Sequence, residues 1–238
     1  MQKFPMDNRL SYFKELTLGV EGWFSKLSIA LFDILLSYQS SKSVKGNLME
    51  IGAWHGKSAA MLAVHASRGE TVFIFDIEVR KELSENIDRF SKALDTSIKL
   101  SKANSFTKIT PSFCSEQYRR MRLVHVDGDH SAYGVYNDLE IANSVLHPHG
   151  VLVVDDFLNE RFPQVSEVTY EYVSIHKYEL CLLLVGGNKG YFVRPKFRDF
   201  YFSYLDSSLA SELLERGIKV EVFSGTNNGY PCLGVRQM

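Results

Sequence analysis

The sequence has few cysteines, no long apolar run and almost no net charge, and each absence excludes a class of protein. Only three cysteines occur in 238 residues, an odd number at wide spacing, which argues against a disulfide framework and favours reduced thiols. The longest apolar run, Leu27 to Leu36, is short and contains Asp33, so we expect no membrane-spanning segment. The N-terminal residues show no signal-peptide core. We therefore expect a cytoplasmic protein.

Charge and complexity narrow the class further. Lysine and arginine number 27 and aspartate and glutamate 28, a formal net charge of −1. This balance gives no electrostatic reason to expect a nucleic acid or an anionic membrane surface as partner. The chain contains no low-complexity tract and no internal repeat, and 45% of its residues are hydrophobic, enough to bury a substantial core as one domain.

The most informative stretch is 48–58, with the sequence LMEIGAWHGKS. An apolar approach and an acid precede Gly52 and Gly56, and an alanine-rich run follows them. This order predicts a strand, a tight loop and a helix, the opening of a nucleotide-binding α/β unit. The glycines let the backbone approach a ligand at the helix N-terminus, where free N–H groups favour acceptors and negative charge.

Spacing separates the interpretations of this stretch. A phosphate-binding P-loop has four residues between its glycine and the Gly-Lys-Ser, whereas three separate Gly52 from Gly56, and residue 51 is isoleucine. A dinucleotide loop has the form G-x-G-x-x-G, and its second glycine is missing here. Two readings remain: an acid-x-Gly-x-x-x-Gly motif that binds a cofactor, or a glycine-rich turn that binds nothing.

Helical and strand patterns alternate around this loop. Residues 8–46 predict helix, with apolar side chains at three- and four-residue steps, and 71–76 predict a buried strand that ends in Asp76. Asp76 lies 24 residues after Gly52, where an acid binds ribose hydroxyls in nucleotide-binding sheets; a helix cap is an equal alternative.

Residues 97–100 predict a third strand and 112–120 a short helix. Asn104 and Ser105 follow the third strand at the sheet edge, where they can hydrogen-bond a base, although a polar turn is the simpler interpretation.

Two later strands end in acids. Residues 122–126 lead into Asp127-Gly128-Asp129-His130, and the apolar run 151–154 leads into Asp155 and Asp156. Because parallel strands deliver their carboxyl ends to one edge of a sheet, we expect these acids to gather near the glycine loop. Clustered carboxylates raise one another's pKa unless a cation is present, and hard oxygen ligands suit Mg²⁺, Ca²⁺ or Mn²⁺. Acids that cap helices or bind the cofactor, with no metal, are the alternative.

The remaining patterns are a helix around 165–173, a hairpin over 182–194 with a glycine-rich link, and a tail. The tail predicts a helix around 209–214 and a strand over 218–223. An added strand, a substrate cover and a dimer contact are all open for it.

Taken together, five blocks resemble the class I S-adenosylmethionine-dependent methyltransferases, specifically the macrocin O-methyltransferase-like branch with its methyltransferase domain 24. The blocks are 21–24, 49–58, 126–131, 150–157 and 185–189. The resemblance implies an α/β fold with a doubly wound, mostly parallel, seven-stranded-type sheet that ends in an antiparallel hairpin. It divides the chain into an N-terminal helical cap (1–46), a cofactor-binding core (47–195) and a C-terminal extension (196–238).

Carried over residue by residue, the resemblance also implies the site. It assigns contacts with S-adenosylmethionine to nine positions: Glu50, Gly52, Ala53, Gly56, Ser58, Asp76, Asn104, Ser105 and Asp127. Asp127, Asp155 and Asp156 match the ligands of a divalent metal, for which we expect Mg²⁺. His130 matches the general base, although a histidine beside metal-binding carboxylates is often only a hydrogen-bonding neighbour of the ligands.

The sequence therefore predicts metal-assisted, S-adenosylmethionine-dependent O-methylation of a small hydroxylated acceptor, a sugar or natural product. Two alternatives stay open: a cephalosporin hydroxylase-like enzyme of the same fold, and a cofactor-binding partner subunit without catalysis. The sequence does not define the acceptor, and it leaves the oligomeric state open, a homo-oligomer included.

Overall fold

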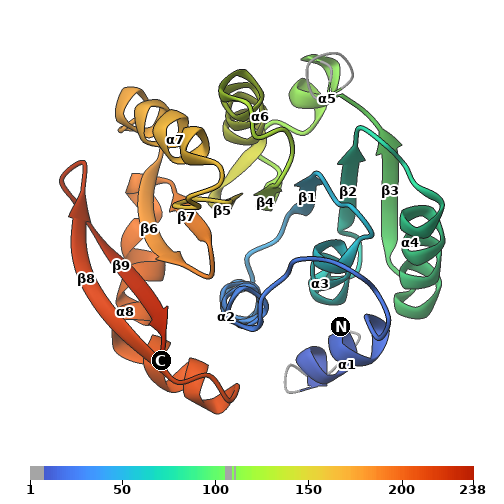
Figure 1. Ribbon diagram of the computed structural model, residues 1–238, viewed down its shortest axis with the longest axis horizontal. Helices are drawn as coiled ribbons and strands as arrows, with labels where there is room; N and C mark the ends of the chain where they lie inside the picture. Colours follow the sequence, from blue (N-terminus) through green and yellow to red (C-terminus); the bar gives the residue numbers. More distant parts are fainter. Residues whose placement is uncertain (1–7, 105–108, 110) are drawn as a thin grey trace.

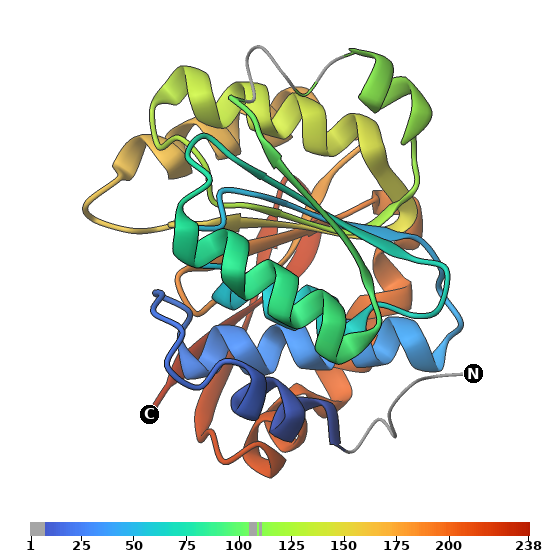
Figure 2. The ribbon, with the colours of Figure 1, turned by 90° about the vertical axis from the view of Figure 1, so that its right-hand side faces the viewer.

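The computed structural model describes residues 8–104, 109 and 111–238. Within these residues the strands form one nine-stranded sheet with helices on both faces (Figures 1 and 2). The predicted α/β class, with a mostly parallel sheet, antiparallel hairpins and N-terminal helices, is confirmed. The division of the chain at residues 46 and 195 remains a prediction.

The sheet has a parallel half and a mixed half. The parallel half consists of β1 (Asn47–Ile51), β2 (Thr71–Asp76), β3 (Ser97–Lys102), β4 (Met121–Val126) and β5 (Leu146–Asp155). The other strands are β6 (Cys181–Gly186), β7 (Lys189–Val193), β8 (Val220–Asn227) and β9 (Tyr230–Gln237). Across the sheet, the nine strands lie in the order β3-β2-β1-β4-β5-β7-β6-β9-β8. Strands β1, β2 and β4 are buried along nearly their whole length, and β5 is buried from Gly150 to Val154, because helices cover both of their faces.

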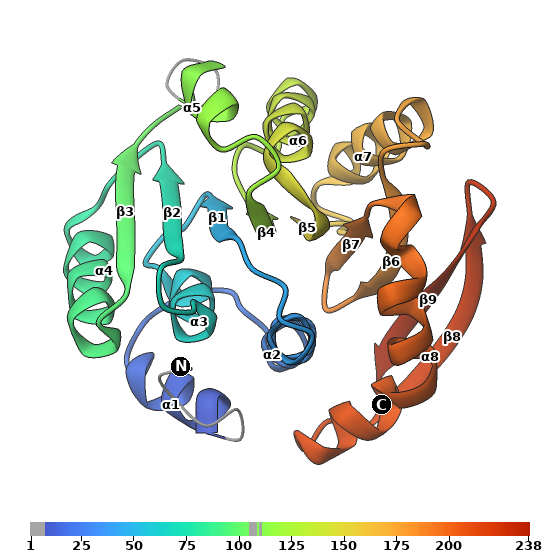
Figure 3. The ribbon, with the colours of Figure 1, turned by 180° about the vertical axis from the view of Figure 1, so that it is seen from behind.

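Helices divide between the two faces of the sheet (Figures 1 and 3). One face carries α1 (Arg9–Leu16), α2 (Lys26–Ser41), α3 (Lys57–His65), α4 (Lys81–Leu94) and α8 (Arg198–Glu215), whose apolar side chains share one core. The other face carries α5 (Pro111–Glu116), α6 (Ala132–Val145) and α7 (Pro163–Ile175) around a second core. None of the described helices is both long and apolar enough to cross a membrane.

The helix predicted over residues 8–46 is present as two helices, and only the segment 17–25 between them, together with the residues after Ser41, departs from the prediction. Gly19 and Gly22 in this segment have φ angles of 78° and 153°, which helices do not accommodate. Ser25 begins the second helix as its N-cap, since its hydroxyl accepts a hydrogen bond from the Ser28 N–H at 3.0 Å. The predicted helix over 112–120 is shorter and ends at Glu116.

The C-terminal residues extend the sheet. Strand β9 pairs in parallel with β6, and β8 pairs antiparallel with β9 as the last strand (Figure 3). The sequence left three roles open for this tail, and the structure shows one of them, because the tail adds strands to the sheet in the form of a hairpin.

A buried polar cluster lies at the amino ends of the parallel strands. The Arg122 guanidinium, 1% exposed, donates to Glu70 Oε2 at 2.9 Å, to Gln39 Oε1 at 3.0 Å and to the His65 carbonyl at 2.7 Å. It thereby links α2 and α3 to the start of β4. A guanidinium in this position is tolerated only because each of these acceptors satisfies it.

We expect Glu70→Gln to destabilise the fold strongly, because it leaves the buried Arg122 charge without a counter-ion. Breaking a buried pair from one side costs about 3–5 kcal/mol. Chemical denaturation measures the loss in free energy of unfolding. The control is Glu221→Gln, which breaks an exposed pair with Arg236 and should cost about 1 kcal/mol or less. Equal losses in both variants would contradict the role of the buried cluster.

Candidate active site

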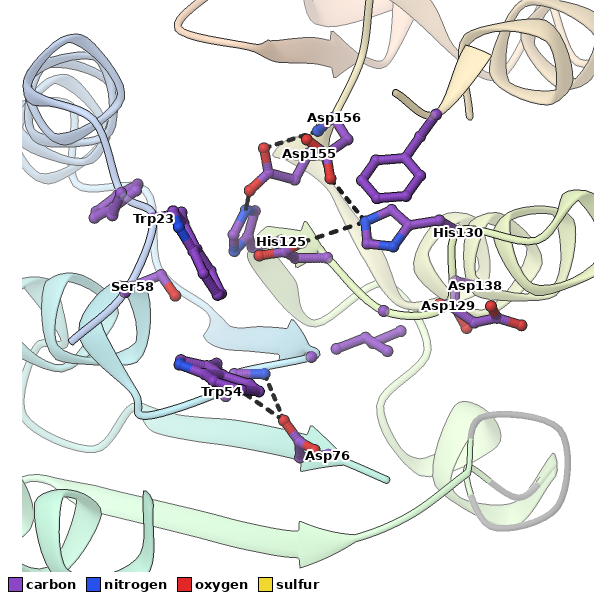
Figure 4. A pocket seen from close by; sticks show the side chains of 18 of the residues that line it. Trp23, Trp54, Ser58, Asp76, His125, Asp129, His130, Asp138, Asp155 and Asp156 are labelled. Atoms are coloured by element: carbon purple, nitrogen blue, oxygen red, sulfur yellow. Dashed lines mark hydrogen bonds and ion pairs between the residues drawn. The ribbon is translucent and has the colours of Figure 1, made fainter. Parts of the chain in front are cut away.

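A cavity of about 1020 Å³ lies at the carboxyl ends of β1, β2, β4 and β5 (Figure 4). Nine residues predicted to form the site line it: Gly52, Ala53, Ser58, Asp76, Asn104, Asp127, His130, Asp155 and Asp156. Ser105, also predicted, lies outside the described residues. Glu50 and Gly56 are not among the described residues that line the cavity. Most of the predicted residues therefore lie together at the carboxyl ends of the strands, where ligands bind in sheets of this kind.

The glycine loop is fixed by a close approach of two strands. Gly52 has a φ of 82°, and a Cβ there would lie 1.8 Å from the carbonyl oxygen of Asp127. Only glycine therefore fits where β1 and β4 end side by side. Gly56, with a φ of 86°, precedes the first turn of α3 and packs on Leu83 and Ile87.

Asp76 holds the glycine loop in place. Its Oδ2 accepts from the N–H groups of Ala53 at 2.8 Å and Trp54 at 3.1 Å, and its Oδ1 accepts from Glu78 at 2.9 Å (Figure 4). A carboxylate has about four acceptor positions, so capacity for a ligand hydroxyl remains. The acid therefore orders the loop in addition to the ribose contact that the sequence predicts for it.

Two tryptophans form the neighbouring wall. The ring centroids of Trp23, on the 17–25 segment, and Trp54 lie 5.5 Å apart (Figure 4). The Arg80 guanidinium lies 4.0 Å over the Trp54 ring, and Trp23 is 85% exposed. An exposed aromatic at the rim of a cavity offers a flat apolar surface to a bound ring.

Across the cavity, acids and histidines form two overlapping groups. His125, Asp127 and Asp155 form one, and Asp127, His130 and Asp156 the other, with the ligand atoms of each group within 4.8 Å of one another. Asp127 belongs to both. Its enclosure and the charge of Asp155 raise the pKa of the Asp127 carboxyl. Asp129 also lines the cavity, but its carboxylate accepts from Ser131, the N-cap of α6.

His130 is oriented by its neighbours. Its Nε2 lies 2.8 Å from Asp156 Oδ2, and its ring stacks on Phe162 with centroids 4.1 Å apart. The contact with Asp156 raises the pKa of His130, burial opposes this, and the charges of Asp156, Asp127 and Asp155 add to the increase.

One histidine in the lining of the cavity was missed by sequence reasoning. His125 Nδ1 lies 2.7 Å from Oε1 of the fully buried Glu50, and its Nε2 lies 3.7 Å from Asp155 Oδ2. Burial and Lys189 lower the pKa of His125, but the carboxylates of Asp155 and Glu50 outweigh them and raise it to about 9. The imidazole is therefore charged near neutral pH. Its only signal in the sequence is one histidine within an apolar strand.

Asn188, in the turn between β6 and β7, and Lys189, the first residue of β7, were also missed as site residues. Lys189 forms an ion pair with Asp155, and Asn188 Nδ2 donates to Asp156 Oδ1 at 2.6 Å. Burial would raise the pKa of Asp155, but His125 and Lys189 hold it well below its usual range. Each of the adjacent acids is therefore contacted by this turn.

The sheet order, the glycine loop and the acid at the end of β2 define the class: this is the fold of the S-adenosylmethionine-dependent methyltransferases. Residues 49–157 match a family described as a methyltransferase domain, Methyltransf_24. This match confirms the predicted resemblance over these residues. A search of curated proteins found no match.

Solved structures with the same fold include three enzymes. CalS11, a TDP-rhamnose 3′-O-methyltransferase of calicheamicin biosynthesis, is 16% identical with a TM-score of 0.57, over 81% of this chain and 87% of that one. The O-methyltransferase NovP is 13% identical with a TM-score of 0.55, over 70% and 78%. MycE, of the mycinamycin pathway, in complex with Mg and SAH, is 14% identical with a TM-score of 0.56, over 78% of this chain and 53% of MycE.

We expect Gly52→Ala to be more destabilising than Gly69→Ala. Both glycines have positive φ angles, 82° and 87°, so both substitutions carry a left-handed backbone cost of about 1–2 kcal/mol. Only the Gly52 variant adds a steric clash, which costs about 1–3 kcal/mol more, because nothing lies within 4 Å of a Cβ at Gly69. Denaturant titration compares them. Equal stability of the two variants would show that the β1–β4 contact is not tight.

In metal-free protein, NMR titration should place the pKa of His130 above the ordinary value of about 6.5. Asp156→Asn should lower it, because the variant loses the acid that favours the imidazolium. In the parent protein, the neutral imidazole of His130, which can accept a proton, therefore predominates only above this raised pKa. His147 serves as the internal control, since burial and His149 set its pKa and the substitution should leave it unchanged. An unchanged His130 would exclude the coupling to Asp156.

Proposed function

We propose that the protein transfers a methyl group from S-adenosylmethionine to a hydroxyl of a small acceptor, a sugar or natural product, with help from a divalent cation. The family domain supports methyl transfer, and the similar enzymes CalS11 and NovP are O-methyltransferases. The observation that carries the proposal is one cavity with two opposite walls. The glycine loop and Asp76 form one wall, and His130 with Asp156 forms the other (Figure 4).

The first wall suits the cofactor. Gly52 lets the loop backbone approach a ligand, Asp76 offers acceptors to ribose hydroxyls, and Asn104 lines the cavity, where the resemblance assigns it to the adenine. Ser58 lies in the first turn of α3, where backbone N–H groups favour a carboxylate. When bound, S-adenosylmethionine supplies a methyl group on a cationic sulfonium, and the acids across the cavity favour that charge.

The second wall suits proton removal. Neutral His130 accepts the proton of the acceptor hydroxyl, and Asp156 at 2.8 Å stabilises the imidazolium that forms. Phe162 and Asp156 together fix the direction of the ring. Alignment of two reactants in one cavity can contribute on the order of 7–11 kcal/mol to lowering a barrier.

The donor set fits a hard divalent cation. Asp127, Asp155 and Asp156 are the acids predicted to hold it, and Asp127 shares one group of closely spaced ligand atoms with Asp155 and a second with Asp156. Carboxylate oxygens are the ligands that Mg²⁺ prefers. A cation bound there would lower the pKa of an acceptor hydroxyl. The similar structure of MycE contains Mg.

Titration calorimetry with S-adenosylmethionine and S-adenosylhomocysteine tests the proposal. We expect micromolar binding, and Asp76→Asn should weaken it at least about tenfold, because hydrogen bonds to a charged acceptor contribute about 1.5–3 kcal/mol each. Glu78→Gln, which alters the exposed acid two residues away, is the control and should bind as the parent does. Absence of binding to the parent protein would exclude the methyltransferase function.

The second arm of this experiment measures methyl transfer. Radiolabelled S-adenosylmethionine is offered with a panel of neutral sugars and polyhydroxylated natural products, and His130→Gln is compared with the parent protein. The proposal expects a methylated hydroxyl, and loss of transfer with retained cofactor binding in the variant. Full activity of His130→Gln would exclude its role as the base.

A further inference from the structure

The register of the sheet places a lysine directly opposite a predicted metal ligand. Asp155, the last residue of β5, pairs across the antiparallel ladder with Lys189, the first residue of β7. Directly opposed residues direct their side chains to the same face of a sheet, with Cβ atoms about 4.5–5.5 Å apart. Strand pairing therefore positions the ion pair between Lys189 and Asp155, in contrast to an ion pair between mobile surface side chains.

The Lys189 side chain is buried, so water does not compete with Asp155 for its ammonium group. The residue is 1% exposed, it is not among the described residues that line the cavity, and its ammonium lies 5.6 Å over the Phe24 ring. A lysine so deeply buried requires a counter-charge, and Asp155 supplies it.

The turn that carries Lys189 is held on several sides. Gly187 and Asn188 have φ angles of 62° and 66°, as a two-residue hairpin turn requires. The Gly187 carbonyl accepts from Ser28 Oγ at 2.7 Å, and the Asn188 carbonyl accepts from the Phe157 N–H at 3.1 Å. These contacts fix the backbone of Lys189 opposite Asp155.

Both oxygens of Asp155 already have protein partners. Oδ1 accepts from the Asp156 N–H at 2.8 Å, and Oδ2 contacts Lys189 and lies 3.7 Å from His125 Nε2. Asp156 also has partners at both oxygens, but apart from His130 they are the neutral amides of Asn159 and Asn188, and none is an ammonium ion. The ligand atoms of Asp155 group with those of Asp127 and His125, and those of Asp156 group with Asp127 and His130. The three predicted metal ligands are thus not equivalent.

We propose that Lys189 is a built-in counter-cation that withholds Asp155 from the metal, leaves Asp127 and Asp156 as its carboxylate ligands, and lowers the affinity of the site for divalent cations. The inference rests on the proposed function, whose metal site it refines. The affinity of an oxygen site depends on the number of ligand charges, and the ammonium cancels one of them. It also repels a second cation at short range.

Manganese binding, followed by electron paramagnetic resonance and calorimetry, tests this inference. Lys189→Met should bind Mn²⁺ at least about tenfold more tightly than the parent protein, since the change frees one carboxylate and removes one repelling charge. Lys196→Met, which removes an exposed lysine, is the control for net charge and should leave the affinity unchanged. Equal or weaker binding by Lys189→Met, or Mn²⁺ binding by none of the proteins, would overturn the inference.

The double variant Lys189→Met/Asp155→Asn covers the case in which the single variant does not fold. It removes both members of the buried pair together, which proteins tolerate better than the loss of one. Because the pair is neutral and Asp155 is withheld, the double variant should bind Mn²⁺ within about threefold of the parent protein. A loss of about tenfold or more would show that Asp155 is a true metal ligand.

S-adenosylhomocysteine is titrated into the same proteins, so that failure of the proposed function is seen separately. No binding of this ligand to the parent protein contradicts the methyltransferase proposal. The Mn²⁺ series alone decides the role of Lys189.

Discussion

Mutual repulsion of carboxylates at one sheet edge is the constraint on which the site depends. Glu50, Asp127, Asp155 and Asp156 lie at the ends of three adjacent strands, and carboxylates gathered in this way repel one another unless positive charge lies among them. The chain supplies part of that charge itself, through His125 and His130, which line the cavity, and through the buried Lys189. Cavity-facing and buried charges thus form one electrostatic unit.

The mixed half of the sheet makes this unit possible. A parallel neighbour of β5 would end at the same edge of the sheet as β5, whereas the antiparallel strand β7 begins there, so the turn before β7 reaches that edge. Asn188 and Lys189 reach Asp156 and Asp155 from that turn. The hairpin at the end of the methyltransferase fold is in this way part of the site as well as of the sheet.

Much of the site could be predicted from local sequence, because acids at the ends of parallel strands gather at the edge of the sheet where ligands bind. Asp76, Asp127, Asp155 and Asp156 were predicted to lie there, and all line the cavity. Lys189 was not predicted, because its contact depends on the register of two strands, which residue patterns alone do not specify. Nor was His125, because burial beside Glu50 is visible only in three dimensions. The break between α1 and α2 was missed because the apolar period outweighed Gly19 and Gly22.

Both tryptophans of the sequence, Trp23 and Trp54, line the same cavity. Indole emission from the whole molecule therefore originates within the site, with no background from tryptophans elsewhere. The two rings are 85% and 39% exposed, so water reaches them to different extents. A ligand that displaces this water changes the spectrum directly, and the chain thus contains its own optical reporter of occupancy.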